Sequence, residues 1–170
     1  MSLLGKKKDT HNAAGQIWAV QNGTAVGLEQ MPDEVIRDGI LGNGIIIIPT
    51  DGMVLSPVDG VVVTVAKSSH AFCIETPDGA EILIHIGADT VALNGEGFRP
   101  HVRQGSRVKA GKKLCTVDLD VLERNQCCPY TAVLLSNCDG FDYCSPHYGP
   151  TIAGKTVVMT YGKNTQKSGD

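Results

Sequence analysis

Residues 68–90 read SSHAFCIETPDGAEILIHIGADT and contain the clearest fold signal in this chain. Two short apolar runs flank the TPDG sequence at 76–79, where proline presets one backbone dihedral and glycine permits a positive one. The stretch therefore predicts two antiparallel strands joined by a turn. His70 and His85 belong to these two segments and become cross-strand neighbours when the chain folds back.

Short apolar runs recur along the chain, separated by turns that draw on 20 glycines and eight prolines. The pattern predicts an all-β, single-domain antiparallel sandwich, similar to a barrel-sandwich, with one or two short helical turns. Asn22-Gly23 predicts a hairpin between 17–20 and 24–28. Helical turns are expected within 31–39 and 118–124. Further strands are expected at 45–49, 53–55, 61–66, 71–75, 81–86, 107–109, 113–118, 132–136 and 156–160.

The composition fits one ordinary domain, because 42% of the 170 residues are hydrophobic and only 5% are aromatic. A net charge of −3 gives no support for binding nucleic acid. We divide the chain into a flexible tail at 1–14, a domain at 15–163 and a frayed end at 164–170. No apolar run reaches the length of a membrane span, and no signal peptide is visible, so a cytoplasmic location with free thiols is expected.

A neutral imidazole offers one nitrogen as a nucleophile and the other as a hydrogen-bond donor. Two imidazoles together can pass a chemical group and stabilise its charge, or they can bind a metal. The residue pattern alone leaves both possibilities open.

Several phrases in this order resemble the glucose-type enzyme IIA component of the bacterial phosphoenolpyruvate-dependent sugar phosphotransferase system. They are PVDG at 57–60, HAFCIE at 70–75, HIGADTV at 85–91, NGEGF at 94–98 and the glycine-rich phrase ending at Leu114. The resemblance extends over nearly all of the chain beyond residue 15. It implies a phosphocarrier of the all-β class inferred above.

The resemblance also implies residue roles. His85 would accept a phosphoryl group on Nε2 from the carrier protein HPr and pass it to a cysteine of a IIB domain. The Gly87 carbonyl would hold the Nδ1 proton of His85. His70 would stabilise the phosphoryl oxygens, and Ser68, where relatives carry threonine, would orient His70. No cofactor is required beyond the transient phosphoryl group, although an adventitious or interfacial zinc at His70 and His85 is compatible with the pair.

The same resemblance implies a docking rim around the acceptor. Its apolar members are Val35, Ile36, Ile40 and Leu41, and Asp33 and Asp89 supply negative charge. The expected partners are HPr, the IIB domain of a sugar permease, and regulated transporters or enzymes. The sequence does not identify the sugar.

Two other classes compete with this interpretation. His85 and Asp89 have the H-x-x-x-D spacing of some zinc-dependent β-rich hydrolases, but the His-x-His pair that those enzymes need downstream is missing. A biotinyl or lipoyl carrier needs a lysine in a tight hairpin, and Lys67 lacks the expected neighbours.

The C-terminal third is rich in cysteine where relatives are not. Cys127, Cys128, Cys138, Cys144 and His147 match no recognised zinc spacing. We therefore expect the cysteines to be small apolar residues of the fold.

Overall fold

The computed structural model describes residues 15–164, without the side chains of residues 143 and 144. The predicted N-terminal tail at 1–14 and nearly all of the predicted frayed end lie outside the described residues. The strands are β1 (Gly15–Trp18), β2 (Gly23–Val26), β3 (Asn43–Pro49), β4 (Met53–Leu55), β5 (Gly60–Val65), β6 (Ala71–Glu75), β7 (Glu81–Ala88), β8 (Phe98–Pro100), β9 (Arg107–Val108), β10 (Lys113–Val117), β11 (Cys128–Leu135), β12 (Phe141–Cys144), β13 (Gly149–Thr151) and β14 (Val157–Lys163).

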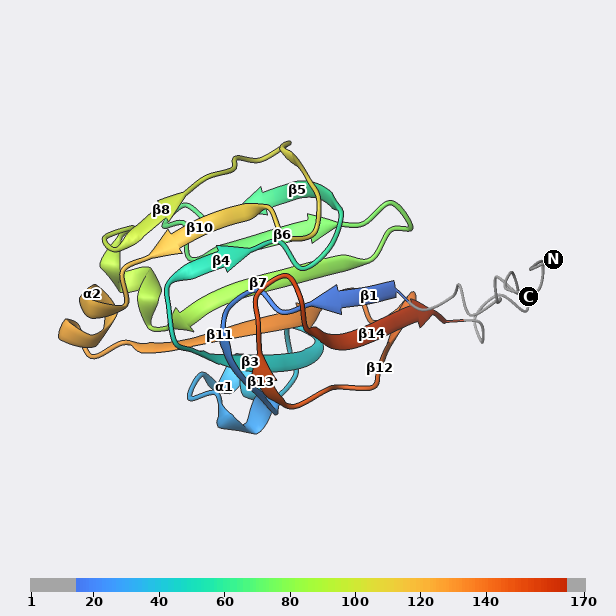
Figure 1. Ribbon diagram of the computed structural model, residues 1–170, viewed down its shortest axis with the longest axis horizontal. Coiled ribbons are helices and arrows are strands. Elements are labelled where there is room, and N and C mark those ends of the chain that lie inside the picture. Colours follow the sequence, from blue (N-terminus) through green and yellow to red (C-terminus); the bar gives the residue numbers. More distant parts are fainter. Residues whose placement is uncertain (1–14, 165–170) are drawn as a thin grey trace.

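The strands form one large and two small antiparallel sheets, which confirms the predicted fold class (Figure 1). The large sheet has the order β13-β2-β3-β11-β7-β6-β5-β9, and the small sheets have the orders β1-β14-β12 and β4-β10-β8. Apolar residues of all three sheets meet in one buried cluster, so the small sheets cover one face of the large sheet. The fold is therefore a sandwich around this main core.

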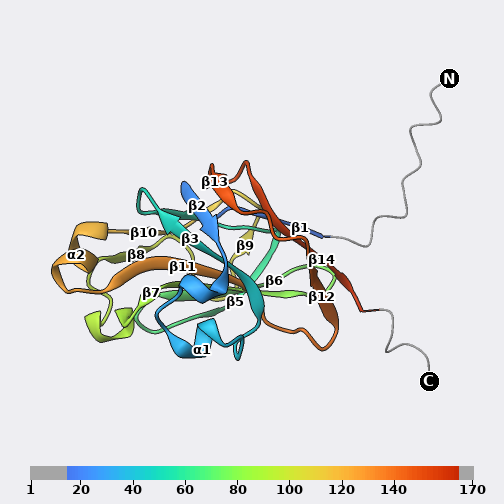
Figure 2. The ribbon, with the colours of Figure 1, turned by 90° about the horizontal axis from the view of Figure 1, so that it is seen from below.

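The opposite face of the large sheet carries a second, smaller core. Met31 and Ile36 pack there against Ile46, Ala132 and Leu134 of the central strands. They come from the segment that contains the 3-10 helix η3 (Leu28–Gln30) and the helix α1 (Glu34–Arg37), which lies beside β3 in both views (Figures 1 and 2). This face, covered over only part of its width, also carries the histidine pair described below.

Both predicted helical turns are present and both begin at an aspartate cap. Asp33 accepts hydrogen bonds from the backbone N–H groups of Val35 and Ile36 at the start of α1. Asp118 does the same for Asp120 and Val121 at the start of α2 (Leu119–Arg124). A side-chain oxygen at this position satisfies backbone donors that a helix leaves free, which explains why such short helices begin there.

The predicted hairpin at Asn22-Gly23 is wrong. β1 pairs with β14 in a small sheet, whereas β2 pairs with β3 and β13 in the large sheet. The connecting residues bond elsewhere: the Ala19 N–H donates to the Thr156 carbonyl, and the Leu55 N–H donates to the Val20 carbonyl. Burial of the connection between the two sheets thus outweighs the local preference of the Asn-Gly pair for a tight turn.

Candidate functional site

His85 lies on β7, an interior strand of the large sheet. Buried Ile82, Ile84 and Ile86 alternate with half-buried residues along the strand, so His85 faces away from the main core. In the register of the sheet, its direct neighbours are Ala71 on β6 and Ala132 on β11. Both neighbours carry only a methyl group, which leaves open space on either side of the imidazole.

His70 immediately precedes β6, and its carbonyl accepts a hydrogen bond of 2.7 Å from the Ile86 N–H. This bond extends the β6–β7 ladder by one step and fixes the His70 backbone beside His85. Ser69, just before it, has a φ of 59°, a left-handed conformation in which the chain turns into the strand. The predicted cross-strand arrangement of the two histidines is therefore confirmed.

The two imidazole rings lie edge to face, with centroids 5.2 Å apart and an interplanar angle of 82°. The Nδ1 atoms of both rings are buried and make no hydrogen bond with any described residue. Nε2 is thus the nitrogen of each ring that can meet an incoming group. Buried polar atoms without partners are uncommon and are concentrated at strained or functional positions.

Burial of both rings favours the neutral form of each imidazole. Burial lowers the pKa of His85 below its ordinary value of 6.5, while the Asp33 carboxylate and then the Gly87 backbone oppose that effect. Burial, followed by the adjacent His85, lowers the pKa of His70. A neutral imidazole has the free lone pair that a nucleophile needs.

Gly87 follows His85 in a backbone conformation that disfavours other residues, with a φ of 80°. A Cβ at this position would lie 2.4 Å from Cγ2 of Thr90 and 2.8 Å from the Cys128 carbonyl oxygen. Thr90 is buried, and its hydroxyl donates a 2.7 Å hydrogen bond to the Ile86 carbonyl. A hydrogen bond with the Gly87 backbone raises the pKa of His85, although Nδ1 makes no bond of regular geometry. The role of the Gly87 carbonyl in holding the Nδ1 proton therefore stays a prediction.

The predicted docking rim is only partly exposed. Val35 and Ile40 are 44% and 70% exposed, whereas Ile36 is 1% exposed and belongs to the second core. Ile36 is therefore a supporting residue, and its prediction as a contact residue is wrong, because one face of the short helix must cover the sheet. Leu41 is half-buried against the same core, and Asp89 is exposed.

Nδ1 of His70 has no hydrogen-bond partner among the described residues, so the orienting role of Ser68 stays a prediction. The chain from Ala66 to Ser69 forms a turn in which the Ser69 N–H bonds to the Ala66 carbonyl. The left-handed Ser69 stands between Ser68 and the histidine and changes the direction of the chain there.

Three residues of the site were not predicted from the sequence. Val91, in the 3-10 helix η4 (Thr90–Leu93), is 59% exposed and adds an apolar side chain near the end of β7. Its position six residues after His85 could have suggested this role. Ala71 and Ala132 flank His85 only through the sheet register, which a single sequence does not reveal.

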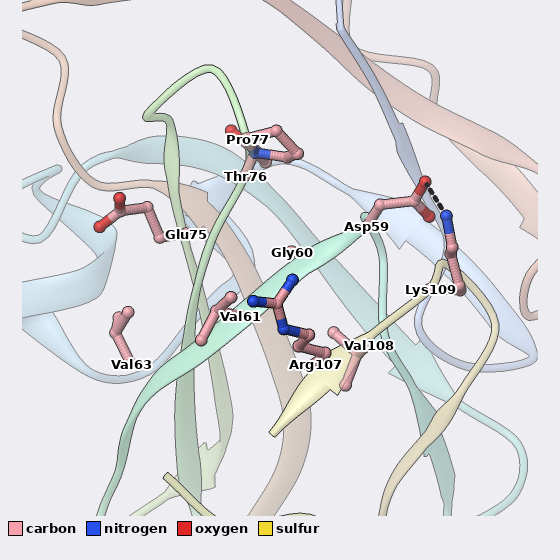
Figure 3. A pocket seen from close by; sticks show the side chains of 10 residues that line it. All are labelled: Asp59, Gly60, Val61, Val63, Glu75, Thr76, Pro77, Arg107, Val108 and Lys109. Carbon is pink, nitrogen blue, oxygen red and sulfur yellow. Dashed lines mark ion pairs between the residues drawn. The ribbon is translucent and has the colours of Figure 1, made fainter. Parts of the chain in front are cut away.

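A cavity of about 540 Å³ lies at the other end of the β6–β7 hairpin, between β5, β6 and β9 (Figure 3). Val61 and Val63 line its apolar side, Arg107 extends across Val61, and Lys109 pairs with Asp59 at 3.6 Å. It contains no histidine and no residue of the predicted site. Five residues of β6 separate the cavity end from His70, a span of roughly 16 Å.

No group of three or more histidine, cysteine, aspartate or glutamate side chains in the described part of the chain is arranged to hold a metal ion. His85 and Asp89 therefore lack the further ligand that the hydrolase alternative requires. Two imidazoles alone supply half of a tetrahedral zinc shell, so an interfacial zinc stays a prediction. Residues 15–164 also contain no helix with the length and hydropathy of a membrane span.

Comparison with known proteins supports the resemblance to the sugar phosphotransferase system and not the hydrolase alternative. Residues 15–141 match the family model described as phosphoenolpyruvate-dependent sugar phosphotransferase system, EIIA 1. The chain is 41% identical over 164 residues to the PTS system glucose-specific EIIA component of Halalkalibacterium halodurans, covering 93% of this chain and 95% of that protein. It is 44% identical over 139 residues to the PTS system N-acetylglucosamine-specific EIICBA component of Klebsiella pneumoniae, covering 80% of this chain.

The chain spans about a fifth of the length of the N-acetylglucosamine-specific EIICBA components of Klebsiella pneumoniae and Escherichia coli, 21% and 22% respectively. Among solved structures, glucose permease IIA from Mycoplasma capricolum is similar with a TM-score of 0.83 and 35% identity. That match covers 88% of this chain and 97% of the other. On sequence and fold together, the chain belongs to the EIIA 1 family of the phosphoenolpyruvate-dependent sugar phosphotransferase system.

Proposed function

We propose that His85 is the phosphoryl carrier of this protein and that the group is bound on Nε2. The observation that carries the proposal is the pair of near-perpendicular imidazoles with centroids 5.2 Å apart and both Nδ1 atoms buried. A lone pair on Nε2 attacks the phosphorus of a phosphohistidine donor; the new N–P bond forms as the donor N–P bond breaks. The donor imidazole leaves neutral, and the Nδ1 proton of His85 stays in place.

His70 is proposed to hold the phosphoryl oxygens during transfer. Its ring is presented edge to face with that of His85, so a nitrogen on one ring can approach a group bound to the other. Phosphoryl transfer needs mainly positioning and stabilisation of oxygen charge, both of which an adjacent imidazole provides. The open space beside Ala71 and Ala132 leaves room for the tetrahedral group.

The donor and acceptor proteins are proposed to dock on the rim around His85. Exposed Val35, Ile40 and Val91 supply apolar contact area, and Asp33 and Asp89 supply negative charge. We propose HPr as the donor and a cysteine of a IIB domain as the acceptor. The EIICBA name of two relatives fits a IIA unit that acts beside IIB and IIC units.

The test is intact-protein and peptide mass spectrometry after incubation with phospho-HPr. We expect one acid-labile phosphoryl group, about 80 Da, on His85 of the wild type. His85→Ala should carry none, with an unchanged thermal unfolding curve. His101→Ala is the matched control, because His101 is exposed and bonds to Thr116 away from the site, at 2.7 Å. Normal labelling of His85→Ala would place the acceptor elsewhere.

A further inference from the structure

Two consecutive cysteines adjoin the acceptor strand. Cys128 begins β11, lies opposite Ala88 of β7, and packs at the edge of the second core, on the sheet face that carries His85. Sγ of Cys127 lies 3.7 Å from the Asp89 carbonyl oxygen. Both thiols are free and half-buried. The pair thus contacts the segment that immediately follows His85 on the chain.

The separation from the acceptor places this pair within reach of a docked protein. Cys128 is four residues along β11 from Ala132, the direct neighbour of His85, which corresponds to roughly 13 Å. A standard protein–protein interface covers about 800 Å² on each partner, equivalent to a disc of about 16 Å radius. A partner centred on His85 therefore extends over Cys128, while Cys127 beside it packs against the main core.

The backbone couples the pair to the acceptor as well. The Cys128 carbonyl is one of the two groups that leave no room for a side chain at Gly87. A bulky group on Cys127 or Cys128 that shifts this carbonyl would also shift the chain two residues beyond His85.

The other cysteines with described side chains are less suited to modification at this face. Cys115 is fully buried, and burial raises its pKa to about 11. Cys73 is half-buried like the pair, but burial, with Glu81 and Glu75, raises its pKa to about 11, a larger shift than at Cys128. Cys138 lies beyond the far end of β11 and bonds to the Leu135 carbonyl.

We propose that Cys127 and Cys128 form a modification site for low-molecular-weight disulfides, and that the resulting mixed disulfide inhibits phosphoryl transfer to His85. The inhibition rests on the function proposed above. In the exchange, a protein thiolate attacks one sulfur of the small disulfide, the S–S bond breaks, and a small thiolate leaves. No net oxidant is consumed beyond that disulfide. Burial raises the pKa of the Cys128 thiol, which lowers the fraction of reactive thiolate near pH 7. Exchange at that residue therefore accelerates as the pH rises.

The experiment treats the full chain with oxidised glutathione, maps adducts by peptide mass spectrometry, and measures the rate of phosphorylation by phospho-HPr. We expect an adduct on Cys127 or Cys128, a rate at least ten-fold lower, and recovery of the rate after dithiothreitol. The double variant Cys127→Ser, Cys128→Ser should keep its full rate after treatment. Cys138→Ser is the matched control and should be inhibited like the wild type.

Adduct mapping does not depend on activity, so the two proposals fail separately. If the untreated protein accepts no phosphoryl group, the proposed function fails. If both cysteines stay unmodified, lose two hydrogens without gaining an adduct, or carry an adduct while the rate stays unchanged, the modification site is overturned.

Discussion

Replacing Gly87 by alanine adds one methyl group two residues after the proposed acceptor, against Thr90 and Cys128. With a φ of 80°, an alanine here must adopt a left-handed conformation that costs about 1–2 kcal/mol. The added Cβ also meets Cγ2 of Thr90 at 2.4 Å and the Cys128 carbonyl oxygen at 2.8 Å. A backbone oxygen cannot move aside by changing rotamer, so we add an overpacking cost of about 1–3 kcal/mol.

Gly105→Ala separates these two costs. Gly105 has a φ of 93°, similar to that of Gly87, and a Cβ there has no heavy atom within 4 Å. The control should lose about 1–2 kcal/mol of unfolding free energy through its backbone conformation alone. Gly87→Ala should lose about 2–5 kcal/mol, the sum of both costs.

The assay is urea unfolding of the wild type and both variants, with linear extrapolation to water and comparison of the slopes. Equal dependence on urea in all three proteins, with a larger loss of unfolding free energy for Gly87→Ala than for Gly105→Ala, supports the geometry of the turn after His85. A loss of unfolding free energy for Gly87→Ala no larger than that for Gly105→Ala would refute the reasoning, since it would mean that Thr90 and the Cys128 carbonyl do not fill the space at Gly87.

Three further predictions concern the histidine pair. His70→Gln should still allow phosphorylation of His85 but slow transfer to a IIB cysteine by roughly ten- to a hundred-fold, because a charge-assisted hydrogen bond is worth about 1.5–3 kcal/mol. Rapid-quench kinetics measure the transfer rate. An unchanged rate would reduce His70 to a packing residue. The pKa of His85 should lie below 6.5 by NMR titration. The unfolded state then binds the proton first as the pH falls through 6.5, so stability should decline on acidification; a midpoint at or above 6.5 contradicts this. Asp33→Asn keeps a helix-capping oxygen but removes the charge that raises the pKa of His85. The pKa of His85 should therefore fall further, while the free energy of unfolding changes little. An unchanged pKa would show that Asp33 does not act on His85.

Local sequence patterns were sufficient to predict the elements whose structure depends on neighbouring residues alone. The alternation of β7, with Ile82, Ile84 and Ile86 directed into the main core, places His85 on the opposite face without any knowledge of the sheet order. The segments 31–39 and 118–124, expected to form helical turns, contain α1 and α2, and each helix begins at an aspartate cap.

The sequence was insufficient where long-range packing decides. Residues 19–22 cross between sheets because their backbone groups bond to distant segments, a preference that the Asn-Gly pair does not encode. Ile36 is buried rather than exposed because α1 has only one turn with which to cover Ile46. β8, β12 and β13 escaped prediction because they are short and lie at sheet edges, where period-two alternation is brief and proline is tolerated.

A phosphoryl carrier has to hold its acceptor still and yet leave it accessible to two large partners. Placement on an interior strand meets the first need, since β7 is hydrogen-bonded on both sides and the His70 carbonyl joins the same ladder. Ala71 and Ala132 meet the second, because larger cross-strand neighbours would cover the ring. The remaining requirement is the tautomer: Nε2 is nucleophilic only while the proton stays on Nδ1. Nδ1 of His85 is buried near the Gly87 backbone but lacks a regular bond, at a cost of about 1–3 kcal/mol for a buried unpaired group. The Gly87 backbone, whose hydrogen bond with His85 raises the pKa of that ring, is the group placed to hold this proton.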